Sequence, residues 1–397
     1  MVGEESSGIH MADERMKILY FSPTYSPITH GPALTAQILA KIPGNHSFEI
    51  RIVAESFEFE KPPNAYLIQI PIIRIFHAWG KWIRMWLYHK KAKDIYKDYA
   101  FDYLIFNDAL LGLISSIAWG NSQIQIWGFC NDSAYMKLST NVNKGKFSFL
   151  MDCLHAVAEF GMMHFADGIF TCSEYLRKQA ILIYKVKREK IKCLYPGISL
   201  PFWHFKEREF NQFKTREEIL FVKSDYKNGG LSVLLRALLR LNRYSFRLHL
   251  VGTPVQQEAN LQRLLSKFPT LNILTYGQLP PFKVRDLMYQ CDTLCIPSLN
   301  EGFGIVNVEG LATGISVVST LTGGIPEVLA FEKYGWTVPP EDDFALAEML
   351  ESCWINKEER LRRAKAGRKM VEAHFTSQHL QDNFIKCLVE NEKNSPF

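Results

Sequence analysis

The stretch Asp292-Thr-Leu-Cys-Ile-Pro-Ser-Leu-Asn-Glu-Gly302-Phe-Gly-Ile-Val-Asn-Val-Glu-Gly310-Leu-Ala-Thr-Gly-Ile-Ser-Val-Val-Ser-Thr320 decides the fold of this protein. The apolar run at 294–297 predicts a buried parallel strand, and 316–319 predicts the next one. Between them the two glycines of Gly-Phe-Gly predict a turn, and 305–313 predicts a short helix that the following glycine ends. The unit is typical of doubly wound sheets, which bind ligands at the carboxyl ends of their strands.

The same stretch places two carboxylates beside a helix start. A helix that begins directly after glycines offers free N–H groups and a positive dipole end to an anion, typically a phosphate. Glu301 lies on the loop before the helix and Glu309 about one turn inside it, so both can face one crevice. A carboxylate accepts two hydrogen bonds, which suits a vicinal diol such as ribose. The candidate phosphate contacts are Gly302, Phe303, Gly304, Ile305 and Val306.

A family resemblance follows from these residues. Glu301 and Glu309, with seven residues between them, are carried in Pro-Ser-Leu-Asn-Glu-Gly-Phe-Gly, and Gly-Gly-Ile-Pro-Glu follows at 323–327. This combination resembles the signature of the retaining glycosyltransferases of family 4, which have the GT-B fold and use nucleotide sugars. The alternative is an ordinary Rossmann-like unit with surface glutamates. The resemblance covers nearly the whole chain from Met16, strongly at 217–340 and weakly before 120.

Composition is that of a globular protein with two domains. The 397 residues are 47% hydrophobic and 22% charged, which suits two cores of ordinary size. The net charge of +5 is too small to indicate nucleic-acid binding. The eight cysteines form no Cys-x-x-Cys pair and favour a reducing cytoplasm over a disulfide framework. No apolar stretch is long enough to span a bilayer, which predicts a soluble or peripheral protein.

Strand–helix alternation occurs twice along the chain and predicts two doubly wound domains that face each other across a cleft. The polar residues 1–15 are interpreted as a disordered segment or a cloning remnant. The resemblance implies that the last helix crosses back to the first domain. The predicted parts are an N-terminal acceptor-side domain at 16–198, a linker at 199–216, a nucleotide-sugar-binding domain at 217–375 and a C-terminal helix at 376–397.

Two first-domain loops correspond to ligand contacts in the resembling family. The loop after the strand 16–22 faces the donor phosphates and the acceptor there and commonly carries two adjacent glycines, whereas this chain has Gly31 followed by Pro32. The strand 123–129 leads into Asn131 and Asp132, where many members have His-Asp near the reaction centre. An amide is no general base at neutral pH, so Asn131 either positions a sugar hydroxyl or belongs to a turn without a catalytic role.

The phosphate cradle of the second domain is expected after the strand 219–222. The family usually supplies an arginine and a lysine there, but Ser224 takes the arginine's place, so Lys227 and Lys223 are the expected sources of positive charge. Two solvated loop lysines are the alternative. The resemblance also implies that the turn containing Leu279 lies beneath the nucleotide base.

The helix expected at 79–99 has two interpretations. It mixes tryptophans with lysines, as helices at membrane surfaces do. Aromatic stripes more often pack into a core, so we favour a helix packed on the sheet with a solvated basic face, and keep peripheral membrane contact through this helix as the alternative.

The sequence thus predicts a cytoplasmic glycosyltransferase that moves a sugar from a nucleotide diphosphate donor to an acceptor hydroxyl with retention. The acceptor is a glycan, a lipid-linked sugar or a small molecule. The resemblance implies no cofactor and no metal, because lysines and a helix N-terminus neutralise the leaving diphosphate. The alternatives are a phosphorylase of the same fold, which would need a pyridoxal-phosphate lysine, and a non-catalytic sugar- or partner-binding protein that kept the fold.

Overall fold

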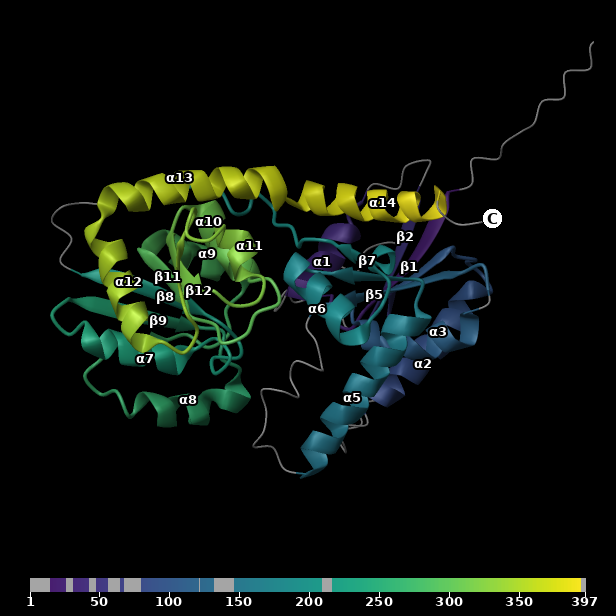
Figure 1. Cartoon of the computed structure of the whole chain (residues 1–397), viewed down its shortest axis with the longest axis horizontal. Coiled ribbons are helices and arrows are strands. Elements are labelled where there is room, and N and C mark those ends of the chain that lie inside the picture. The colour runs from purple at the N-terminus through teal and green to yellow at the C-terminus, as the bar shows by residue number, and fades with distance from the viewer. Residues whose placement is uncertain are drawn as a thin grey trace, which may run out of the picture.

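The computed structural model describes residues 15–25, 31–42, 48–55, 65–67, 80–120, 122–131, 146–208 and 216–393. These residues form two α/β lobes that lie side by side, each built on a parallel sheet covered by helices (Figure 1). The α/β fold class predicted from the sequence is confirmed.

The first sheet has seven strands in the order β3-β2-β1-β4-β5-β6-β7, and all neighbours are parallel. The strand order reverses between β1 and β4, which is the place where such sheets open a crevice. The strands are β1 Met16–Ser22, β2 Phe48–Ala54, β3 Ala65–Leu67, β4 Tyr103–Phe106, β5 Gln125–Cys130, β6 Gly168–Thr171 and β7 Ile191–Cys193.

Helices cover both faces of this sheet. One layer is α2 Gly80–Tyr96, α3 Leu113–Trp119, α5 Lys146–Phe165 and α6 Glu174–Tyr184, with the short turns η1 Ala109–Gly112 and η2 Arg188–Lys190. The other layer is α1 Gly31–Leu39 together with the last helix of the chain, α14 Ser377–Lys393. The helix expected at 79–99 is α2, and Trp79 lies outside the described residues.

The second sheet has six strands in the order β10-β9-β8-β11-β12-β13, again all parallel. Its strands are β8 Glu217–Val222, β9 Phe246–Val251, β10 Ile273–Thr275, β11 Thr293–Ile296, β12 Ser316–Thr320 and β13 Trp336–Val338. Its helices are α7 Leu231–Arg240, η3 Val255–Gln257, α8 Glu258–Leu265, α9 Pro281–Gln290, α10 Ile305–Thr313, α11 Ile325–Leu329, α12 Asp343–Ile355 and α13 Lys357–His374.

The chain crosses between the lobes at two adjacent points. Ile198 lies where the chain first crosses to the second lobe, and Phe375 and Ser377 lie where it returns. The Ile198 N–H donates to the Phe375 carbonyl (2.9 Å), and the Ile198 carbonyl accepts from the Ser377 N–H (2.8 Å). Beyond this point α14 packs on the first lobe, as Figure 1 shows. There the Tyr103 hydroxyl donates to the Leu388 carbonyl (3.2 Å), and Phe384 is fully buried. The predicted return of the last helix to the first domain is confirmed.

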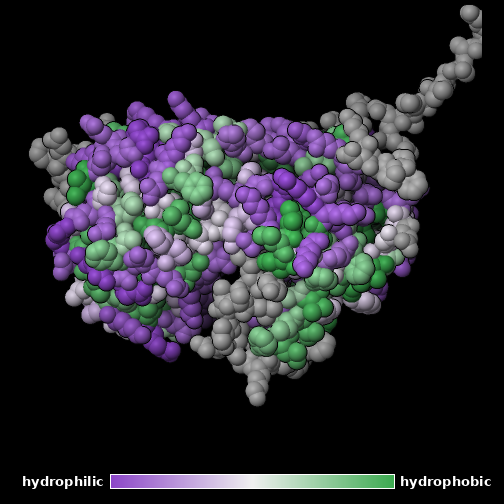
Figure 2. Space-filling view, in the orientation of Figure 1, coloured by the Kyte–Doolittle hydropathy of each residue, from purple (hydrophilic) through white to green (hydrophobic). Residues whose placement is uncertain are grey.

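The face of the molecule drawn in Figure 2 has an apolar region on the first lobe. Figure 2 shows apolar residues along α5, which projects away from the first sheet in Figure 1. Across the described part of the chain, none of the helices combines the length and apolarity that crossing a bilayer requires. All eight cysteines are free thiols, and five of them are buried.

Candidate active site

Two nested glycine loops shape the carboxyl end of the second sheet. Gly304 has φ 91° and starts α10 without any side-chain cap. Gly323, with φ 58°, approaches so closely that a Cβ atom there would lie 1.7 Å from the carbonyl oxygen of Glu301. The Glu301 carbonyl in turn accepts a hydrogen bond from the N–H of Gly324 (3.1 Å). Glycine is the residue that permits both the left-handed backbone and this contact.

Hydroxyl groups at the end of β12 hold the loop that carries Glu301. Ser319 donates to the carbonyl of Ile296 (2.7 Å), and Thr320 donates to the carbonyl of Ser298 (2.6 Å). Both donors are fully buried. The loop is therefore held to the sheet by bonds that are shielded from water and strengthened by the low local dielectric.

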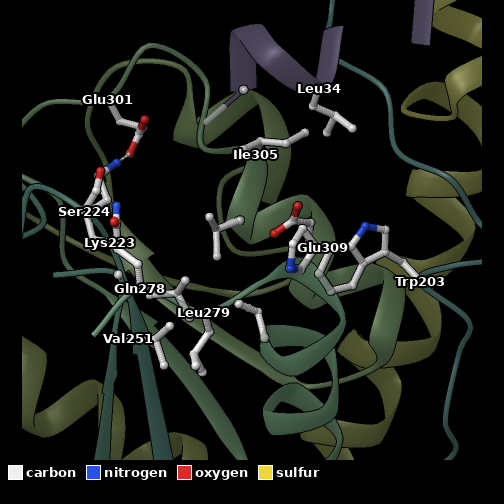
Figure 3. Close-up of a pocket in the computed structure, with 16 residues that line it drawn as sticks. Leu34, Trp203, Lys223, Ser224, Val251, Gln278, Leu279, Glu301, Ile305 and Glu309 are labelled. Atoms are coloured by element: carbon white, nitrogen blue, oxygen red, sulfur yellow. Dashed lines mark hydrogen bonds and ion pairs between the residues drawn. The ribbon is translucent and has the colours of Figure 1, made fainter. Parts of the chain in front are cut away.

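The loop borders a cavity of about 310 Å³ between the lobes, drawn in Figure 3. Strands β8 and β9, helices α9 and α10, the linker and α1 all contribute to its wall. The lining residues are Gly31, Leu34, Trp203, Val222, Lys223, Ser224, Val251, Gly252, Gln278, Leu279, Pro281, Val284, Glu301, Ile305, Val306 and Glu309. Seven of the predicted site residues meet here: Gly31, Lys223, Leu279, Glu301, Ile305, Val306 and Glu309.

Lys223 is the basic side chain among the described residues that line the cavity. Its Nζ forms an ion pair with Oε2 of Glu301, and the same carboxylate oxygen accepts from the Ser298 hydroxyl (3.3 Å). Figure 3 shows this pair on the side of the cavity opposite Glu309. Lys227 is exposed on the turn that follows β8 and is absent from the described cavity wall. The structure therefore brings Lys223, and not Lys227, to the crevice.

Glu309 projects from α10 into the cavity beside the indole of Trp203, as Figure 3 shows. None of the described residues donates a hydrogen bond to its carboxyl group, and burial raises the pKa of Glu309 to about 8. A carboxyl with a raised pKa and no partner is a site at which a ligand's hydroxyl groups find an acceptor. Trp203, which sequence reasoning left in the linker, is a buried part of this wall.

The turn after β10 is braced from behind by a chain of three polar side chains. His249 is nearly buried; one ring nitrogen lies 2.8 Å from the Glu218 carboxylate and the other 2.8 Å from the Tyr276 hydroxyl. The carbonyl of Gly277 accepts from the N–H of Gly252 (2.7 Å). These bonds present the next residues, Gln278 and Leu279, to the cavity.

The first lobe reaches the cavity through α1. The resemblance placed Gly31 in the loop after β1, but α1 begins at Gly31, so Gly31 lies on the first turn of a helix. Pro32 explains the difference, because proline lacks an N–H and its fixed φ suits the first turn of a helix. Gly31 and Leu34, on the first turn of α1, line the cavity.

The end of β5 also approaches the glycine loop. The backbone oxygen of Asn131 would lie 2.5 Å from a Cβ atom at Gly302, and its side-chain Nδ2 donates to the carbonyl of Asn107 (2.7 Å). Asn107 is buried and donates to the Ser22 hydroxyl (3.0 Å) and to the Pro32 carbonyl (2.7 Å). Asp132 lies outside the described residues.

Sequence reasoning missed Asn107, although its place directly after β4 was a usable signal. Parallel strands end at one edge of the sheet, and Asn107 follows the strand next to the switch point. Its amide ties the ends of β1, β4 and α1 together.

Glu327 joins the two lobes. Its carboxylate accepts from the N–H groups of Glu174 (2.9 Å) and Tyr175 (2.6 Å) and from the Tyr195 hydroxyl (2.9 Å). The negative charge therefore caps the first turn of α6, where the helix dipole favours an anion. Glu327 is the last residue of the Gly-Gly-Ile-Pro-Glu pattern, but the sequence alone indicated no role for it.

The described residues contain no group of three or more histidines, cysteines or acidic residues that could hold a metal ion. The cavity instead combines a helix N-terminus, one lysine and two glutamates.

This chain is similar to known proteins in the sequence of its second lobe and in the fold of almost its whole length. Residues 204–370 match the family model described as glycosyl transferases group 1. The Escherichia coli strain K12 protein named "Putative colanic acid biosynthesis glycosyltransferase WcaL" is 30% identical over 211 residues, which are 51% of this chain and 51% of that protein. The chain thus spans about half the length of the curated relatives it matches.

Two solved structures cover almost the whole chain. Sucrose-phosphate synthase from Thermosynechococcus elongatus has a TM-score of 0.78 at 17% identity and covers 96% of this chain and 100% of its own. Anabaena Alr3699/HepE in complex with UDP and glucose has a TM-score of 0.73 at 16% identity, covering 94% and 100%. The chain has the GT-B fold, and its second lobe carries the match to the group 1 glycosyl transferases.

Proposed function

We propose that this protein is a retaining glycosyltransferase of family 4 that transfers a sugar from a nucleotide diphosphate donor to an acceptor hydroxyl in glycan biosynthesis. The observation that carries the proposal is one cavity that brings together the uncapped start of α10, Lys223 and the carboxyl of Glu309, to which no described residue donates a hydrogen bond. The group 1 family match and the UDP-bound structural neighbour support it.

In this proposal the diphosphate lies between the start of α10 and Lys223. The first N–H groups of α10, at Ile305 and Val306, present the positive end of the helix dipole. Lys223 exchanges its ion pair with Glu301 for the donor diphosphate, so that donor binding releases Glu301 toward the sugar. Lysine and helix together stabilise the charge that develops on the leaving group. The reaction is proposed to need no metal ion and no cofactor.

Glu309 is proposed to hold the ribose. A vicinal diol offers two hydroxyl donors, and an ionised carboxylate accepts both. The turn with Gln278 and Leu279 lies below the base, where backbone groups read its edge. The acceptor enters from the side of the first lobe, close to Asn131, whose amide orients a hydroxyl group rather than removing its proton.

A non-catalytic binding protein is the second candidate. Asn131 favours it, because an amide stands where many family members have a histidine, and its Nδ2 is already bonded to Asn107. Such a protein binds nucleotide sugars in the same cavity without releasing nucleotide.

A thermal-shift screen with UDP-, GDP- and ADP-sugars tests the proposal. A donor at about a hundred times its Kd stabilises the protein by about 2.7 kcal/mol, so one nucleotide class should stand out. Release of free nucleotide from that donor with candidate acceptors then separates transfer from binding. If no nucleotide sugar raises the melting temperature, both candidate functions are contradicted. If a nucleotide sugar raises it but no free nucleotide is released under any acceptor condition, the result supports the binding protein.

Lys223→Ala is expected to weaken binding of the nucleoside diphosphate by about 1.5–3 kcal/mol, the scale of a charge-assisted hydrogen bond. Lys227→Ala serves as the matched variant, because it removes the same charge from the turn directly after β8. Its loss of affinity should be smaller, since its side chain is exposed away from the cavity wall. Calorimetry that finds the larger loss in Lys227→Ala would return the phosphate role to that residue.

Donor binding is expected to release protons at neutral pH. With a pKa of about 8, the Glu309 carboxyl is mostly protonated at pH 7, whereas a diol that donates two hydrogen bonds favours the ionised form. Roughly one proton per nucleotide sugar should therefore leave. The measurement is the dependence of the binding enthalpy on the ionisation enthalpy of the buffer, made with a nucleotide sugar because its diphosphate diester does not titrate near pH 7.

Glu309→Gln is the control for this proton release and should bind the donor without releasing a proton. Equal proton release by the wild type and by Glu309→Gln would exclude Glu309 as the source.

The Glu309 carboxyl also predicts how the free energy of unfolding depends on pH. Its pKa is raised in the folded state, so the folded protein binds more protons than the unfolded chain between about pH 4.5 and 8. This contribution to stability is present below that window and is lost as the pH rises through it.

A further inference from the structure

The first lobe exposes its large apolar side chains on one layer of helices. In residues 80–208 these side chains are Trp86, Tyr96, Ile117, Phe149, Leu150, Leu154, Val157, Phe160, Phe165 and Leu182. All of them belong to α2, α3, α5 or α6. On the opposite face, the described side chains of α1 and α14 include no exposed large apolar residue. The asymmetry is that of a surface that faces an apolar partner on one side.

The exposed apolar surface of this layer is clearest on helix α5. Its described exposed side chains from Phe149 to Phe165 are apolar apart from His164, and Figure 2 shows apolar residues along this helix. Val157 is 67% exposed. A helix on the surface of a soluble domain normally turns its charged residues outward. The acidic Glu159 is instead buried and accepts from the Tyr184 hydroxyl (2.7 Å).

Exposed cations lie on two of the same helices and on the segment that follows α6. Lys90 and Lys93 on α2 and Lys178 on α6 are exposed, and Lys185, Lys187 and Arg188 follow α6. This segment lies against the C-terminal end of α5, because Lys190 Nζ donates to the carbonyl of His164 (2.5 Å). Among the described residues of the layer and its adjoining segments, the exposed acidic residues are outnumbered by the exposed cations; they are Asp94, Asp98, Asp102, Asp167 and Glu189. Asp94 is paired with Lys97 (3.3 Å).

We propose that the outer face of α2, α3, α5 and α6 docks on the surface of an anionic lipid bilayer. Apolar side chains enter the boundary between headgroups and acyl chains, while the surrounding lysines meet the negative surface potential. An anionic bilayer matches the charge better than a second copy of this chain, whose own face would be equally basic. The inference extends the membrane alternative for α2 to the whole layer, with α5 as its centre.

The face is separate from the cavity, so the inference stands or fails without the proposed function. A docked first lobe would hold its cleft close to acceptors that are themselves anchored in the bilayer. The class of acceptor that this favours is a lipid-linked sugar.

Flotation of the full chain with vesicles tests the proposal. The probe is phosphatidylcholine with about 30 mol % phosphatidylglycerol, compared with phosphatidylcholine alone. The protein should float with the anionic vesicles and be released by high salt. The double variant Val157→Glu/Leu182→Glu changes two well-exposed positions of the layer. It should bind these vesicles about tenfold or more weakly than the wild type.

The matched control is Val255→Glu with Ile355→Glu, which makes the same chemical change at exposed positions of the second lobe and should float like the wild type. A second test changes charge. The double variant Lys90→Glu/Lys178→Glu on the first lobe should lose vesicle binding, and the double variant Lys267→Glu/Lys369→Glu on the second lobe should retain more of it. Unchanged melting temperatures and unchanged nucleotide-sugar shifts exclude misfolding.

Three outcomes would overturn the proposal. The first is a wild-type chain that does not float with anionic vesicles. The second is equal loss in the first-lobe variants and their second-lobe controls. The third is a wild-type dimer in sedimentation that Val157→Glu with Leu182→Glu dissociates while flotation stays the same, which would assign the face to a second copy of the chain.

Discussion

Glu301→Gln is expected to lower kcat about a hundredfold or more while the donor KM changes little. The carboxylate lies at the edge of the cavity, paired with Lys223 and bonded to Ser298. In the proposed mechanism, the donor diphosphate engages Lys223, and the freed carboxylate faces the donor sugar and stabilises the positive charge that develops as the glycosidic bond breaks. Glutamine keeps the shape and removes that charge, so the loss falls on the transition state.

Glu309→Gln is the comparison for this prediction. It removes a contact that is present before and during the reaction, so it should raise the donor KM more than it lowers kcat, as loss of uniform binding does. Steady-state kinetics with saturating acceptor separates the two variants. Normal turnover by Glu301→Gln, together with lost chemistry in Glu309→Gln at saturating donor, would reverse the assignment. A trapped sugar ester on Glu301 would instead indicate a covalent nucleophile.

Gly323→Ala is expected to destabilise the protein by about 3 kcal/mol or more and to abolish activity. Gly323 has φ 58°, and its Cβ atom would lie 1.7 Å from the carbonyl oxygen of Glu301. Backbone atoms cannot rotate away as a side chain does, so the loop that carries Glu301 must move. Buried hydroxyls of β12 hold that loop, so the movement also breaks their bonds.

Gly277→Ala provides the matched control, since Gly277 has φ 63° but the nearest atom to its Cβ would be the Thr253 oxygen at 3.8 Å. It should cost only the strain of a left-handed alanine, about 1 kcal/mol. Urea denaturation measures both losses and kcat measures their effect on catalysis. Equal losses in the two variants would show that the contact with Glu301 relaxes without cost.

The sequence predicted elements well where local pattern and burial agree. The bounds of β1 and α10 match the predicted ranges, because apolar runs that end at glycine or at polar residues leave little choice. Glu301 and Glu309 were assigned to one crevice from their spacing along a strand, a loop and a helix. Both line the cavity.

The remainder depended on contacts between residues far apart in the chain. Nothing near Lys223 indicates that it pairs with Glu301, and its exposed neighbour Lys227 was the first candidate from sequence, with Lys223 the second. Glu327 caps a helix in the other lobe, and Trp203 reaches the cavity from a segment without periodicity. The Glu327 contact depends on how the two lobes meet, whereas Lys223 and Glu301 meet because β8 and β11 are neighbours in one sheet. No local pattern encodes either pairing.

The double crossing at Ile198 has a mechanical consequence. A single connecting segment would act as a ball joint and let the lobes swing and twist in any direction. Here two segments run side by side and are tied by hydrogen bonds on both sides of Ile198, and Gly197 allows contact with Thr376, whose carbonyl oxygen would lie 2.3 Å from a Cβ atom. Because two connections lie side by side, we expect them to resist twisting of one lobe against the other more than a single connection would, and to leave rotation about the line through the two crossings as the easiest relative movement.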